Sequence, residues 1–207
     1  MDPYRPVNPG KVEWSGDNPG IYLKQDPAGD WSSLGIYFSV NLSPHGTGET
    51  MIVLEQPDDP LGLPDANNIC LTNNDELTHY LIRDYLSKFP SFKGRKGLDA
   101  MTFRLIEKAY TSGDLRDEWI ETVVSGDDLE VTMVWSQLQE PFAAEVAAEA
   151  SATGEHEMYS VFLEAKDAAI SVNGKPFSGS VATRQFFGKE MSTAFMAISE
   201  TWLIPAR

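Results

Sequence analysis

Apolar and polar residues alternate along much of this chain, so that every second side chain is apolar. This period of two is typical of a β-strand with one buried face, because successive side chains of a strand point to opposite sides. The clearest example is residues 34–42, and residues 51–55 repeat it after the Gly-containing turn at 45–48. The two segments therefore predict a pair of neighbouring antiparallel strands.

The second half of the chain continues this pattern, with turn residues between the apolar runs. Residues 112–114 and 125–128 are rich in Ser, Gly and Asp, and 173–174 is Asn-Gly, a strong hairpin signal. The segments between these turns predict strands that follow one another in mostly antiparallel order. They are expected at 102–110, 118–124, 129–135, 158–164, 168–172, 181–187 and 192–204.

Residues 74–89 break the alternation and predict the one main helix. Their apolar residues recur every three or four positions, which places them on one helix face. Asn73 precedes the segment as a candidate N-cap with Glu76 three residues later, and Pro90 ends it. A second, short surface helix is expected in the Ala- and Glu-rich segment 140–150, with a mobile acidic loop as the alternative.

Together these elements predict a mainly β fold of the α+β class. About nine or ten strands are expected to form an antiparallel β-barrel or a strongly curved sheet, covered by the helix at 74–89. Strand number and order resemble the architecture of lipocalin-like barrels, and a two-sheet β-sandwich is the alternative. Residues 1–20, rich in Pro, Gly and Asn, are expected to form an irregular arm, and residues 21–207 a single β-rich domain.

Charge narrows the range of partners. The chain has 31 Asp and Glu against 16 Lys and Arg, a formal net charge of −15. Nucleic acids and anionic membranes attract cationic surfaces, so we expect neither as a partner.

No apolar run reaches the roughly 18 residues of a membrane span, and the first residues lack an apolar signal core. Because Cys70 is the single cysteine, no internal disulfide can form, and a cytoplasmic location is expected.

Sequence motifs of known chemistry are absent. There is no phosphate-binding loop and no Gly-x-Ser-x-Gly elbow, and one cysteine excludes a multi-Cys zinc site. The histidines, His45, His79 and His156, are far apart and lack the spacing of metal ligands. We therefore expect no metal and no cofactor.

Two glutamates on predicted apolar strand faces are the candidate catalytic residues. Glu200 shares a predicted face with Met196 and Ile198, provided that no bulge interrupts the strand. Glu121 follows Trp119 on another such face. A carboxyl buried there has a raised pKa unless a cation pairs with it, and a raised pKa suits a general acid or base.

Cations and aromatic rings on the strand faces are the candidate ligand-binding residues. Arg184 and Arg104 share faces with apolar residues and are the expected partners of the two glutamates. Such an Arg–Glu pair either binds a carboxylate or hydroxyl of a small ligand or serves the structure alone. Large rings mostly pack in cores, and a minority line cavities. The aromatic candidates are Trp119, Trp135, Tyr159 and Trp202.

Three functions remain open at this point. The first is the binding of a small, mostly apolar molecule in a β-barrel cavity. The second is an enzyme that uses a buried glutamate as general acid or base in the same cavity. The third is an interaction protein without a ligand, such as a homodimer. We favour the first, because isolated polar residues on apolar faces and many aromatic residues fit it.

Overall fold

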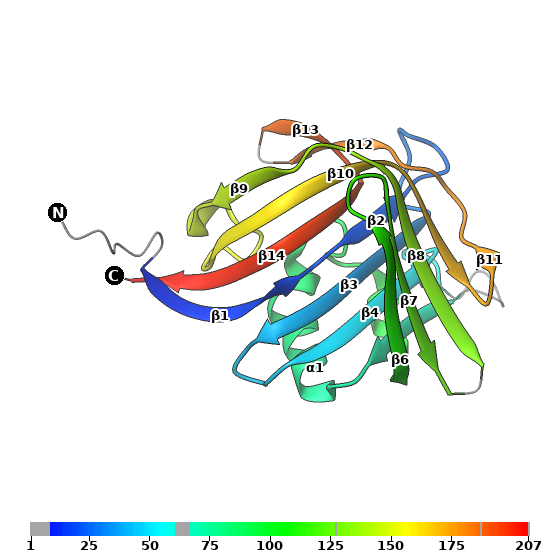
Figure 1. Ribbon diagram of the computed structural model, residues 1–207, viewed down its shortest axis with the longest axis horizontal. Coiled ribbons are helices and arrows are strands. Elements are labelled where there is room, and N and C mark those ends of the chain that lie inside the picture. Colours follow the sequence, from blue (N-terminus) through cyan, green and yellow to red (C-terminus); the bar gives the residue numbers. More distant parts are fainter. Residues whose placement is uncertain (1–8, 61–66, 127, 187, 207) are drawn as a thin grey trace.

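The computed structural model describes residues 9–60, 67–126, 128–186 and 188–206, and most of them lie in strands (Figure 1). The helical elements are α1 (Asp75–Asp84), α2 (Lys96–Asp99) and the 3₁₀ turns η1 (Leu86–Lys88) and η2 (Ala148–Ala150). The strands are β1 (Gly10–Asp17), β2 (Gly20–Leu23), β3 (Ser33–Leu42), β4 (Gly48–Glu55), β5 (Asn68–Thr72), β6 (Thr102–Asp114), β7 (Glu118–Ser125), β8 (Leu129–Leu138), β9 (Phe142–Val146), β10 (Glu157–Val172), β11 (Lys175–Pro176), β12 (Thr183–Phe186), β13 (Lys189–Ser192) and β14 (Ala194–Pro205).

Twelve of the described strands form one large, curved sheet, and β12 and β13 form a separate hairpin. From β14 the order runs β2-β3-β4-β5-β6-β7-β8-β10, and β10 pairs with β14 again, so these strands follow one another in a ring. The sheet is mixed, because β5 and β6 run parallel while the other paired strands run antiparallel.

This architecture confirms the prediction of a mainly β fold with a strongly curved sheet and one main helix. The lipocalin-like description is not confirmed. Its basis was a sequential antiparallel strand order, and that order is interrupted where the chain passes through α1 between the parallel strands β5 and β6.

Two hydrophobic clusters lie on the two faces of the sheet. Along β3, Ile36 and Phe38 belong to the first cluster, whereas Tyr37 between them belongs to the second. The second cluster draws residues from β2 to β8, β10 and β14, so side chains such as Trp135 fill the interior of the ring. The first cluster lies outside the ring, where α1 and η1 cover the sheet. In Figure 1, α1 accordingly lies behind β3 and β4.

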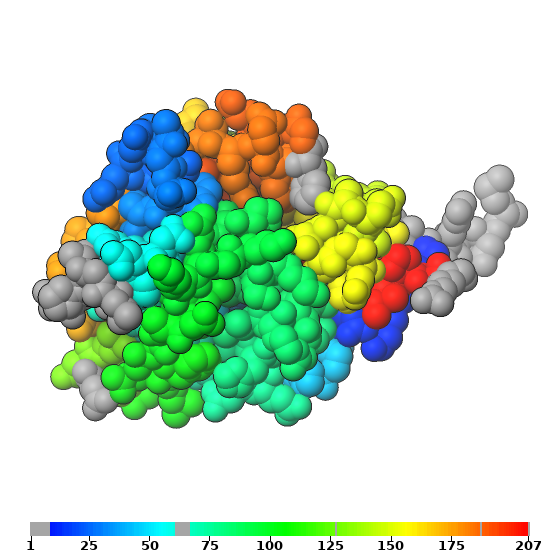
Figure 2. Space-filling model, turned by 180° about the vertical axis from the view of Figure 1, so that it is seen from behind, coloured from blue at the N-terminus to red at the C-terminus, as the bar shows by residue number. Residues whose placement is uncertain are grey.

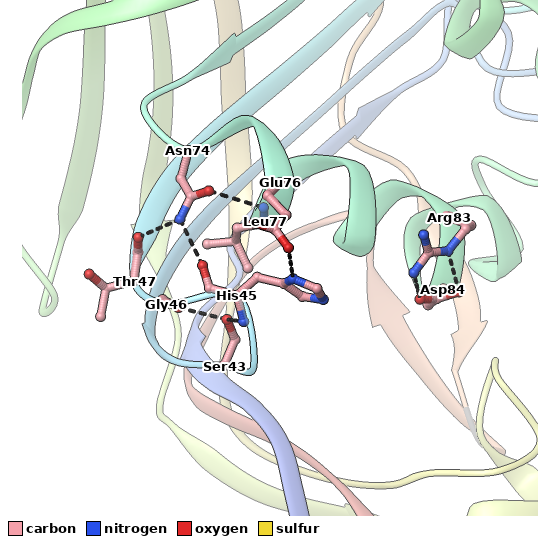
Figure 3. A network of polar contacts seen from close by, with 9 residues as sticks. All are labelled: Ser43, His45, Gly46, Thr47, Asn74, Glu76, Leu77, Arg83 and Asp84. Atoms are coloured by element: carbon pink, nitrogen blue, oxygen red, sulfur yellow. Dashed lines mark hydrogen bonds and ion pairs between the residues drawn. The ribbon is translucent and has the colours of Figure 1, made fainter.

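The start of α1 is fixed by Asn74, one residue after the predicted N-cap (Figure 3). The Asn74 side chain accepts a hydrogen bond from the Leu77 amide at 3.1 Å, which satisfies a free helix donor. Its amide nitrogen donates to the carbonyls of His45 and Thr47 at 2.9 and 3.0 Å. This residue therefore also ties the helix to the turn between β3 and β4. The segment predicted at 74–89 contains α1 followed by η1.

Two segments differ from their predictions. Residues 10–20, expected within an irregular arm, form β1 and the start of β2, while residues 1–8 of that arm lie outside the described part. The segment 140–150, expected as a helix, contains strand β9 and the short turn η2. Pairing with the edge of β10 explains the second difference, because tertiary contacts override local propensity even for Ala and Glu, which are strong helix formers. No helix in the described ranges is long and apolar enough to cross a membrane.

The end of strand β1 lies between two strands, because Gly16 pairs with Glu200 of β14 and also with Val40 of β3. A Cβ atom at Gly16 would lie 2.1 Å from the Ser39 carbonyl oxygen and 2.8 Å from the Val40 Cα. Both are backbone atoms, so a side chain here forces the strands apart.

We expect Gly16→Ala to lower the free energy of unfolding by about 1–3 kcal/mol, the usual effect of overpacking. Chemical denaturation measures this change. Gly126→Ala is the matched control, because its nearest neighbour is the end of the flexible Glu107 side chain. Equal stability of the two variants would contradict this reading of the β1–β3 approach.

Candidate functional site

A β-bulge in β14 decides where Glu200 points. In the β10–β14 ladder, Tyr159 pairs with Thr201 and Val161 with Ile198, so one residue of β10 faces two of β14. The backbone accommodates the extra residue at Ser199, whose φ is 53°. A bulge of this kind reverses the alternation of faces beyond it.

The bulge corrects the predicted neighbours of Glu200. Before it, Met196 faces the filled ring, and Ile198 packs against the same cluster. After it, Glu200 and Trp202 line a cavity on the outer face, beside Phe195. Glu200 therefore does not share a face with Met196 and Ile198.

Glu200 is 3 % exposed and held by two hydrogen bonds. The Asn18 side-chain amide donates to its Oε1 at 3.0 Å, and the Trp202 indole N–H donates to the same atom at 2.7 Å. Burial raises the pKa of the Glu200 carboxyl from its ordinary 4.5 to about 7, although both hydrogen bonds lower it. Glu200 thus exchanges a proton near neutral pH.

The cavity at Glu200 has a volume of about 760 Å³ and walls from distant parts of the chain. Strands β2, β10 and β14 form its floor, and the segments after η1 and around η2, with the β12–β13 hairpin, surround it. In Figure 2 the green, yellow and orange regions that contain these surrounding segments are neighbours on one side of the molecule. Its lining residues are Asn18, Tyr22, Trp31, Lys88, Phe89, Pro90, Ser91, Lys93, Val146, Ala150, Ser151, Ala152, Met158, Phe162, Arg184, Gln185, Phe186, Phe195, Glu200 and Trp202.

Arg184 enters this cavity from β12 and lies among aromatic rings. Its guanidinium carbon is 5.1 Å from the ring centres of Tyr22 and Phe186 and 5.3 Å from that of Phe195. Its Nε atom is buried and has no hydrogen-bond partner among the residues that the structure describes. Burial lowers the pKa of the Arg184 guanidinium, which nonetheless remains a cation at neutral pH.

Glu121 lies in a different place, at a smaller cavity of about 170 Å³. Thr111 and Trp119 donate hydrogen bonds to its two carboxylate oxygens at 2.9 and 2.7 Å. Burial raises the pKa of the Glu121 carboxyl, and the charges of Glu49 and Asp17 raise it further. Because this cavity also contains Met196 and Ile198, Glu121 and Glu200 lie on opposite faces of the sheet.

The remaining predicted site residues are spread over the molecule. Of the six ligand-binding candidates, Arg184 and Trp202 line the larger cavity and Trp119 lines the smaller one. Trp135 is fully buried in the ring, where its indole donates to the Gly20 carbonyl at 3.0 Å. Arg104 is exposed on β6, and Tyr159 is hydrogen-bonded to Glu145 at the surface of β10.

Several cavity residues were not predicted as site residues. Asn18 stands in a turn before β2, and Lys88 and Phe89 lie at the end of the segment predicted as the main helix. Their contribution depends on which loops meet above the sheet, and strand periodicity carries no information about that. Arg184 and Phe186, by contrast, belong to a segment dense in polar and aromatic residues.

The histidines are dispersed in space as in the sequence. His45 pairs with the exposed Glu76 at 2.9 Å, His79 lies against Phe103, and the buried His156 bonds Thr153 at 3.0 Å. Among the residues that the structure describes, no group of three or more His, Cys, Asp or Glu is arranged to hold a metal ion.

Comparison with known proteins identifies no family. No family profile and no curated protein sequence matches this chain. Among solved structures, it is similar to the enduracididine biosynthesis enzyme MppR complexed with pyruvate. The alignment covers 96 % of this chain and 89 % of that chain, with 10 % identity and a TM-score of 0.33. A similarity this weak carries no argument about function, which rests instead on the geometry of the cavity.

We expect Glu200→Gln to change how stability depends on pH. The protonated carboxyl is favoured in the folded state, so its contribution is complete below its ordinary pKa of 4.5 and is lost as the pH rises to about 7. Between pH 5 and pH 8 the variant should therefore gain on the original protein by up to about 3 kcal/mol in free energy of unfolding. Denaturation at each pH measures this gain.

The exposed Glu140 supplies the control for this experiment. Glu140→Gln should follow the stability curve of the original protein at every pH. If the Glu200→Gln curve also runs parallel to the original, Glu200 is not protonated in the folded state as described.

Proposed function

We propose that this protein binds a small, mostly apolar molecule in the larger cavity. The observation that carries the proposal is an open space of about 760 Å³ whose walls are mostly apolar and include seven aromatic residues. Small-molecule sites usually measure about 300–1,000 Å³ and combine apolar walls with a few polar groups. Here the polar groups include Asn18, Arg184 and Glu200.

The aromatic walls support each other, so the cavity is formed before a ligand arrives. Phe89 stacks on Trp202 with ring centres 5.8 Å apart. Phe195 meets Tyr22 edge-on at 5.5 Å and Phe162 at 5.8 Å. A preformed site loses little conformational entropy on binding, which favours affinity.

The proposed site is not the interior of a barrel, which is where the sequence pattern placed it. The interior of the strand ring is filled by the second hydrophobic cluster. The larger cavity lies on the other side of the sheet, among residues of the first cluster such as Met158 and Phe162. The sheet therefore supplies the floor of the site and not its enclosing wall.

We expect N-phenyl-1-naphthylamine, a neutral apolar probe that fluoresces in dry surroundings, to bind the protein. The double variant Ala150→Trp/Ala152→Trp adds two indoles to the cavity lining. It should weaken binding by at least about tenfold, or 1.4 kcal/mol. Fluorescence titration measures both affinities.

The matched control is Ala143→Trp/Ala147→Trp, which adds the same rings at exposed positions outside the lining. It should bind the probe like the original protein. No saturable binding, or equal binding by the two double variants, would contradict the proposed site.

An enzyme that uses the same cavity is the second candidate, and the pKa of Glu200 favours it. A buried carboxyl with a pKa of about 7 is half protonated at neutral pH, which suits both proton donation and proton abstraction. Perturbed carboxyls in clefts are frequent at active sites.

If Glu200 acts in this way, Glu200→Gln should abolish turnover and leave probe binding intact. The measurement is mass-spectrometric analysis of a panel of small organic acids, esters and amides after incubation with each protein. A compound consumed by the original protein and not by the variant supports the enzyme. Consumption by both, or by neither, counts for a binding protein without catalysis at Glu200.

A further inference from the structure

We propose that the molecule bound in this cavity carries a carboxylate, which pairs with the Arg184 guanidinium while its apolar remainder packs against the aromatic walls. This inference rests on the proposed binding function and adds the chemical class of the ligand. Three observations carry it: the charges of the lining, the unpaired state of Arg184 and the surroundings of its guanidinium.

The charge of the cavity lining is opposite to that of the whole chain. Acidic residues outnumber basic ones by 31 to 16 in the sequence. The lining instead contains Lys88, Lys93 and Arg184 but Glu200 as its single acidic residue. A cationic lining in an anionic protein concentrates field lines at the cavity and attracts anions there.

Arg184 contacts aromatic rings, but no acidic side chain in the described part of the chain neutralises its charge. Among the described residues no acidic side chain forms an ion pair with it, and its Nε atom is buried without a hydrogen bond. An unsatisfied donor of a buried cation is costly, so such a group normally has a partner. The planar guanidinium of Arg184 can donate two parallel N–H hydrogen bonds to the two oxygens of a carboxylate.

Glu200 lies in the same cavity but is not that partner. Its Oε1 is occupied by Asn18 and Trp202, as the hydrogen bonds show. Burial raises the pKa of the Tyr22 hydroxyl to about 12, while the nearby Arg184 lowers it and Glu200 raises it, so Tyr22 lies close to both charges. Arg184 and Glu200 thus face one space without contact, which leaves room for a ligand group between them.

The rings around Arg184 favour a carboxylate over a phosphate. Tyr22, Phe186 and Phe195 lie around the guanidinium of the half-buried Arg184 and reduce its contact with water. Removing a doubly charged phosphate from water costs more than removing a singly charged carboxylate, and Arg184 is the one cation among these three rings. A singly charged carboxylate can pair with the guanidinium, and an aromatic or aliphatic remainder of the same ligand can pack against the apolar lining of the cavity.

The protonation state of Glu200 should modulate this binding. Below pH 7 the neutral carboxyl leaves the cavity cationic, and above pH 7 its negative charge repels a bound carboxylate. The residues of β10 that line the cavity are Met158 and Phe162, and both are uncharged. The charged or titratable groups near Glu200 or in the same lining are Asp17, Tyr22, Lys88, Lys93 and Arg184.

The test is displacement of N-phenyl-1-naphthylamine from the full chain by three matched compounds: 3-phenylpropionate, 3-phenylpropanamide and 2-phenylethyl phosphate. We expect the carboxylate to displace the probe about 10- to 100-fold more strongly than the amide, as a charge-assisted hydrogen bond implies. Arg184→Met should abolish that preference while the amide still competes, and Arg184→Lys should keep part of it.

Lys189→Met is the control variant for this series. Lys189 stands on the same hairpin but is exposed, paired with Glu164 at 2.9 Å and absent from the lining. Its loss should leave the preference for the carboxylate unchanged.

Between pH 6 and pH 8 the carboxylate should lose about fivefold or more in affinity, and Glu200→Gln should remove that loss.

The outcomes separate the two proposals. If the probe does not bind, the proposed function fails and this inference fails with it. If the probe binds but the carboxylate and the amide compete equally, or the preference survives in Arg184→Met, the cavity binds apolar molecules and the carboxylate is wrong. Stronger competition by the phosphate ester assigns the site to phosphates and also overturns the inference.

Discussion

The ladder between β10 and β14 is the constraint on which the rest of the structure depends. It joins the two ends of the strand order, so that one face of the sheet encloses a filled core and the other is left to α1, η1 and the β12–β13 hairpin. The bulge at Ser199 lies in this same ladder and turns Glu200 away from the filled core. This one strand pairing therefore determines both how the strand ring closes and where the Glu200 side chain points.

The two buried glutamates differ in their hydrogen bonds and in the cavities that they line. Glu121 receives a hydrogen bond on each carboxylate oxygen from its neighbours, and its cavity is small and acidic. Glu200 receives both of its bonds on one oxygen and shares a larger cavity with Arg184, which forms no ion pair with any acidic residue of the described ranges. Desolvated charges that remain unpaired destabilise a fold, and proteins commonly retain them where a ligand or a reaction uses them.

The cavity combines a rigid floor with walls from remote segments. Strands supply Tyr22, Phe162 and Phe195, whose rings pack against one another, whereas loops and the hairpin supply the cations. This division suits a binding site, because the sheet holds the apolar surface in place while polar groups on connecting segments select the ligand. It also places Arg184 on the element that is least integrated into the large sheet.

The sequence by itself determined the elements whose residues repeat with a clear period. The alternation at 34–42 corresponds to β3, and the stripe at 74–89 to α1 with η1. Only the tertiary structure decided that β1 and β9 are strands. The partner β14 of β1 is distant in the chain, and β9 is a strand because it pairs with the edge of β10. It also decided the face of Glu200, because one extra residue in a ladder reverses every side chain beyond it and leaves the local pattern unchanged. The presence of both Glu200 and Arg184 in one cavity followed from that reversal and from the docking of a hairpin. Both are long-range effects that period and composition do not encode.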